Sequence, residues 1–75
     1  MIQYKNIAGD SGIKAFEISE HSITVQFTTG ATYLYTYSSA GKKHIEKMKK
    51  LALAGKGLST FISQNVKDNY DSIIE

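Results

Sequence analysis

The sequence predicts an α+β fold in which a three-stranded antiparallel β-meander is covered on one face by two helices. Two patterns predict this fold. Residues 13–37 hold three segments in which apolar and polar residues alternate, as in strands with one buried face. Residues 40–67 hold apolar residues at helical spacing, interrupted at Gly55 and Gly57. We expect strands at about 13–19, 23–28 and 31–37, and helices at about 40–54 and 58–67.

The chain is long enough for one domain at most, because its 75 residues can only just bury a core that outweighs their conformational entropy. Residues 8–12 form a turn-forming cluster, so any strand near Ile2–Tyr4 would be short. We therefore predict an N-terminal arm over residues 1–12 and a single domain over residues 13–75.

The register of the second hairpin decides which face the tyrosines occupy. A two-residue loop would set Gln26 against Tyr33, whereas a three-residue loop over 28–30 sets Val25 against Tyr33 and Ile23 against Tyr35. Only the second register gathers the apolar residues on one face, and it places a glycine where the loop needs a positive φ. We therefore expect Tyr33 and Tyr35 to face the core, rather than to form an exposed platform for stacking on bases.

The other elements follow from the same patterns. A tight turn near Glu20 and His21 pairs Ile18 with Ile23 and Phe16 with Val25, which extends the apolar face. Ser38 or Ser39 is the expected N-cap of the first helix. The two helices have their own apolar arcs, which consist of Ile45, Met48, Leu51 and Ala52 in the first and Leu58, Phe61, Ile62 and Val66 in the second. The pattern leaves open whether Asp68 and Asn69 end the second helix or whether Tyr70, Ile73 and Ile74 prolong it.

Positive charge is concentrated in one segment. Residues 42–56 contain six of the nine lysines and one glutamate, a net charge of +5, whereas the rest of the chain carries three lysines and six acidic residues, a net charge of −3. The chain has no arginine, and lysine cannot form the planar bidentate pairs by which arginine reads guanine. Any nucleic-acid binding is therefore expected to be weak and directed to the backbone.

Several functional classes receive no support from the residues. The chain has no cysteine, so thiol chemistry and thiolate metal sites are excluded. His21 and His44 have no carboxylates at metal-ligand spacing, and no serine can be given a base and an orienting acid. The first residues lack the apolar run of a signal peptide. We expect a non-enzymatic cytoplasmic protein that has no cofactor, no metal and no membrane contact.

The landmarks along the chain resemble those of the KTSC domain family, a short module named after the C-terminus of some lysyl-tRNA synthetases and also found alone in small bacterial proteins. The resemblance covers residues 11–70. Its motifs here are Ser11-Gly12-Ile13-Lys14-Ala15, Phe27-Thr28-Thr29-Gly30, Tyr33-Leu34-Tyr35 and Gly57-Leu58-Ser59-Thr60-Phe61-Ile62. The resemblance implies a fold of a β-meander covered by helices. It also implies that Tyr33 and Tyr35, the two tyrosines of the family's Tyr-x-Tyr motif, are mainly structural, and it suggests RNA as the partner.

Two functional hypotheses follow. In the first, the protein binds RNA or another polyanion by phosphate contacts from lysines and by stacking on an edge tyrosine, with the candidate residues Lys42, Lys43, Lys47, Lys49, Lys50, Lys56 and Tyr37. The plain alternative is a solvated helix face paired through Glu46. In the second hypothesis, the polar sheet face around Leu34 or the groove between the helices binds a protein. Leu53, within the lysine arc, is either such a contact or covered by the second helix.

Overall fold

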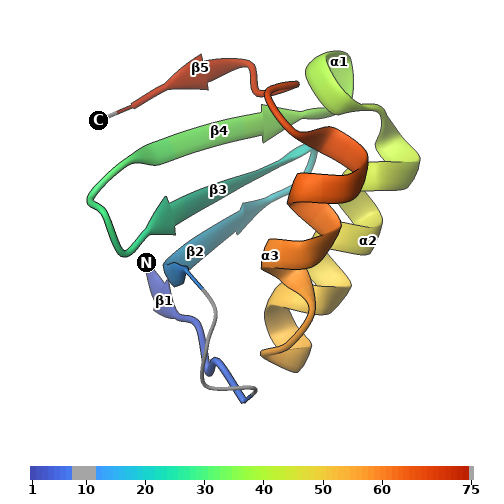
Figure 1. Ribbon diagram of the computed structural model, residues 1–75. Coiled ribbons are helices and arrows are strands. Elements are labelled where there is room, and N and C mark those ends of the chain that lie inside the picture. The colour runs from blue at the N-terminus through green and yellow to red at the C-terminus, as the bar shows by residue number, and fades with distance from the viewer. Residues whose placement is uncertain (8–11, 75) are drawn as a thin grey trace.

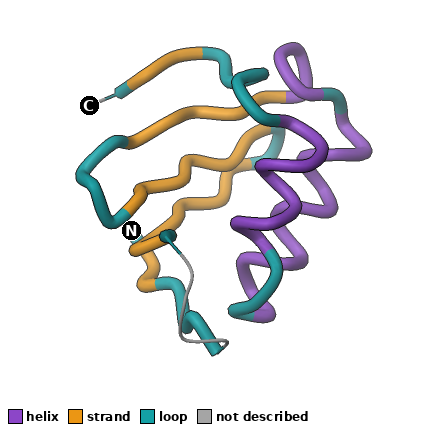
Figure 2. The backbone as a smooth tube through the Cα atoms, in the orientation of Figure 1, coloured by secondary structure: helices purple, strands orange, loops and turns teal. Residues whose placement is uncertain are grey.

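The computed structural model describes residues 1–7 and 12–74, and in these residues one antiparallel sheet carries helices on one of its faces (Figure 1). The sheet has the strand order β1-β2-β3-β4-β5, so that neighbours in sequence are neighbours in space. The elements along the chain are β1 (Ile2–Gln3), β2 (Ile13–Ser19), β3 (Ser22–Phe27), β4 (Thr32–Thr36), α1 (Tyr37–Ala40), α2 (Lys42–Ala54), α3 (Leu58–Phe61), the π-helical turn η1 (Ile62–Val66) and β5 (Ser72–Ile73). Figure 2 shows the division into a strand half and a helix half.

The expected register of the central hairpins is confirmed. Val25 pairs with Tyr33 and Ile23 with Tyr35, as the three-residue loop requires. Gly30 has a φ of 98° in that loop, a conformation that a residue with a Cβ rarely adopts. The pairs Phe16–Val25 and Ile18–Ile23 in the first hairpin are also as expected, and a bulge shifts the register near the start of β2.

The sheet has five strands, and the prediction of three was therefore wrong. Ile2 and Gln3, placed in the predicted arm, pair with Phe16 and Ala15 and form the edge strand β1. At the other edge, β5 pairs with Tyr33 and Leu34 of β4. Two-residue strands show no alternation, so their sequences carry no signal of pairing. The turn predicted at residues 8–12 lies outside the described residues, apart from Gly12.

The first predicted helix, 40–54, is observed as α2, and a separate short helix, α1, precedes it. Thr36 caps the four-residue helix α1: its hydroxyl accepts from the Ser39 N–H at 3.1 Å, and the Ser39 hydroxyl accepts from the Thr36 N–H at 3.0 Å. The expected caps Ser38 and Ser39 therefore lie inside α1, and Tyr37 begins this helix instead of ending β4. Gly41 then separates α1 from α2. The prediction missed this arrangement because Thr36 fits a strand as well as a cap.

The second predicted helix, 58–67, is observed as α3 and the π-helical turn that follows it directly. The Lys67 N–H donates to the Ile62 carbonyl at 2.6 Å, and the positive φ of Lys67 ends the turn. Residues 70–74 therefore leave the helix. The Tyr70 ring stacks on Tyr33 with centroids 4.8 Å apart, while Ile73 joins the sheet edge.

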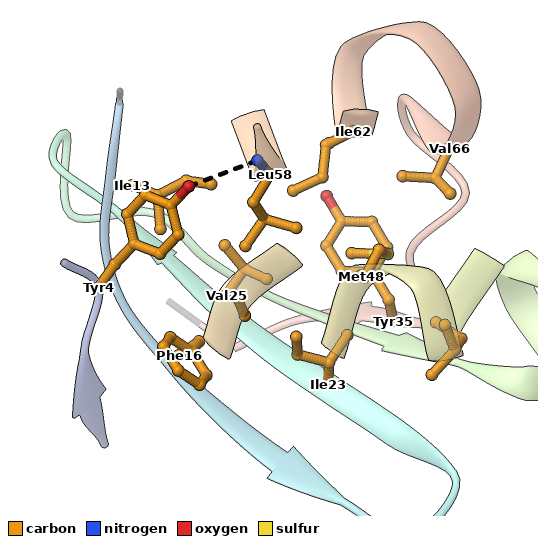
Figure 3. Close-up of a cluster of buried hydrophobic side chains, with 12 residues drawn as sticks. Tyr4, Ile13, Phe16, Ile23, Val25, Tyr35, Met48, Leu58, Ile62 and Val66 are labelled. Carbon is orange, nitrogen blue, oxygen red and sulfur yellow. Dashed lines mark hydrogen bonds between the residues drawn. The ribbon is translucent and has the colours of Figure 1, made fainter. Parts of the chain in front are cut away.

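The core lies between the sheet and the helices and includes a residue of the predicted arm (Figure 3). Tyr4 is 3% exposed, and its hydroxyl accepts from the Leu58 N–H at 3.4 Å. The Ile7 N–H donates to the Gly55 carbonyl at 2.8 Å, and a Cβ at Gly55 would lie 2.6 Å from that of Lys5. The first seven residues are thus attached to the turn that joins α2 to α3.

We expect Tyr4→Ala to lower the free energy of unfolding by about 3 kcal/mol, because it removes a buried aromatic ring and leaves a cavity. Tyr4→Phe keeps the ring and should cost only about 1 kcal/mol, the value of one hydrogen bond. Ile7→Ala is the control, since the Ile7 side chain is 64% exposed. Urea denaturation of the four proteins measures these values. A Tyr4→Ala protein as stable as Ile7→Ala would contradict the role of Tyr4 in the core.

Candidate functional site

Three lysines of α2 line one side of a groove, and α3 with η1 forms the other side. Lys43, Lys47 and Lys50 stand at positions i, i+4 and i+7, which places them in one stripe roughly 10 Å long at 1.5 Å per residue. All three are exposed. The groove has a volume of about 610 Å³ and is lined by Lys43, His44, Glu46, Lys47, Lys50, Phe61 and Asn65. We call it the α2–α3 groove.

The groove also contains an aromatic pair and an amide. The rings of His44 and Phe61 meet edge to face, with centroids 5.8 Å apart. His44 Nδ1 lies 2.9 Å from the Ala40 carbonyl, which can only accept, so Nδ1 carries the proton and Nε2 of the neutral ring is an acceptor. Asn65 Nδ2 donates to the Phe61 carbonyl at 3.2 Å. The groove therefore combines positive charge, aromatic surface and hydrogen-bonding groups.

Lys49 belongs to the helix but not to the stripe. Its side chain is only 14% exposed, and Nζ donates to the Glu20 carbonyl at 2.8 Å and to Glu46 Oε2 at 2.9 Å. The same ammonium lies 5.6 Å from the centre of the Tyr37 ring. Lys49 thus joins α2 to the turn between β2 and β3, and these contacts occupy its ammonium.

Tyr37, the predicted stacking residue, is held in the same cluster. Its hydroxyl donates to Glu46 Oε2 at 2.5 Å, and the His21 ring packs against it edge to face at 5.0 Å. The hydrogen bond to Glu46 raises the pKa of Tyr37, while the hydrogen bonds from Lys49 and then Tyr37 lower the pKa of Glu46. Tyr37 is partly exposed, but its ring and hydroxyl already have partners in the fold.

The remaining predicted residues lie outside the α2–α3 groove. Lys42, at the start of α2, and Lys56, in the turn before α3, are exposed and are not among the groove residues. Tyr35 is 1% exposed and Tyr33 packs against the core more loosely. Both tyrosines border a second hollow of about 460 Å³ beside the end of η1, where Tyr70 stacks on Tyr33.

Sequence reasoning did not bring Phe61, His44 and Asn65 into the candidate site. The helical spacing places Phe61 in the apolar arc of the second helix, and the groove forms only once η1 lies beside α2. The sequence does carry one indication of this groove. If the two helices pack side by side, an aromatic residue of the second and the lysines of the first both border the contact between them. Leu53 is 58% exposed, so the second helix does not cover it.

No protein-family model matches the sequence, and no curated protein or solved structure matches it. In residues 1–7 and 12–74, no cluster of three or more histidine, aspartate or glutamate side chains is arranged to hold a metal ion. Within the same residues, no helix has the length and apolar character needed to cross a membrane. The function must therefore be inferred from the geometry of this chain.

Burial, together with the neighbouring hydroxyls of Tyr33 and Tyr70, raises the pKa of Tyr35 to about 12 from an ordinary value of 10.0. The unfolded chain therefore releases this proton at a lower pH than the folded chain. We expect the Tyr35 contribution to stability to be complete below pH 10 and to disappear as the pH rises from 10 towards 12. Urea denaturation across this range should show a steeper fall for the wild type than for Tyr35→Phe. Equal slopes would contradict the shift.

Proposed function

We propose that the protein is a small non-enzymatic module that binds the phosphate backbone of RNA or a similar nucleic acid. The observation that carries this proposal is the stripe of Lys43, Lys47 and Lys50, whose ammonium groups stand exposed along one groove. Glu46 is the acidic residue of this groove; Lys49 pairs with its charge, and Tyr37 donates a hydrogen bond to the same carboxylate. The stripe therefore offers a phosphate chain a surface of one dominant sign.

The position of Lys49 refines the proposal. A lysine that already bonds a carboxylate and a carbonyl would have to break those contacts to reach a phosphate. The binding set is therefore Lys43, Lys47 and Lys50, with Lys42 and Lys56 as peripheral exposed charges. The resemblance to the KTSC family, through Tyr33-Leu34-Tyr35 and Gly57–Ile62, gives further support to RNA as the ligand class.

We expect the triple change of Lys43, Lys47 and Lys50 to Gln to abolish most binding of labelled single-stranded RNA at low salt. Each lost phosphate contact should lower the slope of log affinity against log salt by about 0.7, so that the slope falls by about 2 in total. Fluorescence anisotropy titrations at several salt concentrations measure both quantities.

The matched control changes Lys5, Lys14 and Lys67 to Gln, which alters the net charge equally at exposed positions outside the α2–α3 groove. At moderate salt the control should keep the affinity within about twofold of the wild type, because these lysines are not among the groove residues and salt screens their longer-range effect. Equal losses in both triple variants would show that net charge alone causes binding. An absence of binding by the wild type at low salt would overturn the proposal.

The alternative function is a protein-interaction module, and two apolar side chains outside the core favour it. Leu53 is 58% exposed beside the lysines. Leu34 follows Tyr33 and precedes the buried Tyr35 in β4, so its side chain points to the sheet face opposite the core. An acidic protein partner would contact the same ammonium groups. Its complex should survive nuclease treatment and weaken on Leu53→Lys, whereas RNA binding should tolerate this change.

A further inference from the structure

The α2–α3 groove has an apolar component that phosphate binding does not use. Phe61 packs against the core, yet its ring is only partly buried and borders the groove beside His44. Apolar surface left in water is unfavourable, and a phosphate chain cannot cover it. A ligand that contacts only the lysine stripe would therefore leave the ring solvated.

The polar groups beside Phe61 are suited to the edge of a planar heterocycle. The side-chain amide of Asn65 has two donor hydrogens and an acceptor oxygen, and its bond to the Phe61 carbonyl uses one of these hydrogens. When the His44 ring is neutral, Nε2 is an acceptor, because Nδ1 donates to the Ala40 carbonyl. Donors and acceptors thus border the same hollow as the aromatic surface.

The dimensions agree with such a ligand. The volume of about 610 Å³ lies within the range of small-molecule sites, roughly 300–1,000 Å³. The lysine stripe is about as long as three stacked nucleotides, at roughly 3.4 Å each. A strand whose phosphates follow Lys43, Lys47 and Lys50 would therefore bring a base to the aromatic pair.

We propose that the α2–α3 groove binds an unpaired nucleobase, so that the ligand is single-stranded nucleic acid rather than a duplex or a simple polyanion. This inference rests on the proposed function and adds the base as a second contact. The base stacks on Phe61, and its edge meets Asn65 and His44. A duplex would first have to unstack and unpair a base, at a cost of a few kcal/mol.

The experiment compares three ligands with the wild-type protein: a short thymidine strand, an abasic strand of the same length, and a duplex. Lysine contacts to phosphate do not need the 2′-hydroxyl, so DNA oligonucleotides are suitable probes. We expect the thymidine strand to bind about tenfold more tightly than the abasic strand, the effect of one stacked base. Nuclear magnetic resonance should show shifts of the Phe61 ring and the Asn65 side-chain amide with the thymidine strand only.

Two variants assign the base contact to Phe61. Phe61→Leu should remove the preference for the thymidine strand while keeping the affinity for the abasic strand, and Phe61→Tyr should retain the preference. Binding of the abasic strand also reports whether Phe61→Leu is folded. Equal affinity of the wild type for the thymidine and abasic strands would overturn the base site and leave phosphate binding intact. Binding of none of the three ligands would overturn the proposed function as well.

Discussion

The pairing of Val25 with Tyr33 is the constraint on which the rest of the fold depends. In a strand, a shift of one residue would turn every side chain to the opposite face. With the observed register, Ile23, Val25 and Tyr35 lie on one side of the sheet and are almost completely buried. This apolar side of the sheet must be shielded from water by other elements, and those elements must be apolar on the side that packs against the sheet. The helices meet that requirement, and their polar arcs consequently face water, where the lysines lie.

The lysines of α2 form two groups: Lys49 makes contacts within the fold, whereas Lys43, Lys47 and Lys50 are exposed along the groove. Their spacing in the sequence does not distinguish the two groups. Lys49 is directed towards the turn between β2 and β3, and its ammonium contacts the Glu20 carbonyl, the Glu46 carboxylate and the Tyr37 ring. Exposed ion pairs contribute little stability, so the orientation of α2 is set mainly by its buried residues Ile45, Met48 and Ala52, and Lys49 adds a bridge to the turn. The lysines of the stripe have no such task. Because lysine is a point charge without bidentate geometry, selectivity in this groove would have to come from aromatic and amide groups.

The sequence predicts those elements that are long enough to show a periodic arrangement of apolar residues. The central strands, their register and the apolar arc of α2 follow from alternation and helical spacing, and the loop at Gly30 follows from the need for a positive φ. The edge strands β1 and β5 are too short to show a period. The burial of Tyr4 depends on a contact with Leu58, far along the chain. The lysines of the candidate site could be found from charge alone, but Phe61 and Asn65 could not, since their position depends on how η1 lies beside α2.

The N-terminal residues connect the fold to the candidate site. The α2–α3 groove lies between two helical segments that are joined by the turn at residues 55–57. That turn is held by the residues that follow β1: the Ile7 N–H donates to the carbonyl of Gly55, and the Tyr4 hydroxyl accepts from the N–H of Leu58, the first residue of α3. Gly55 permits this close approach because it has no Cβ to meet Lys5. Residues remote from the lysine stripe therefore hold the turn that joins the two helical walls of the groove, although they contribute none of its lining.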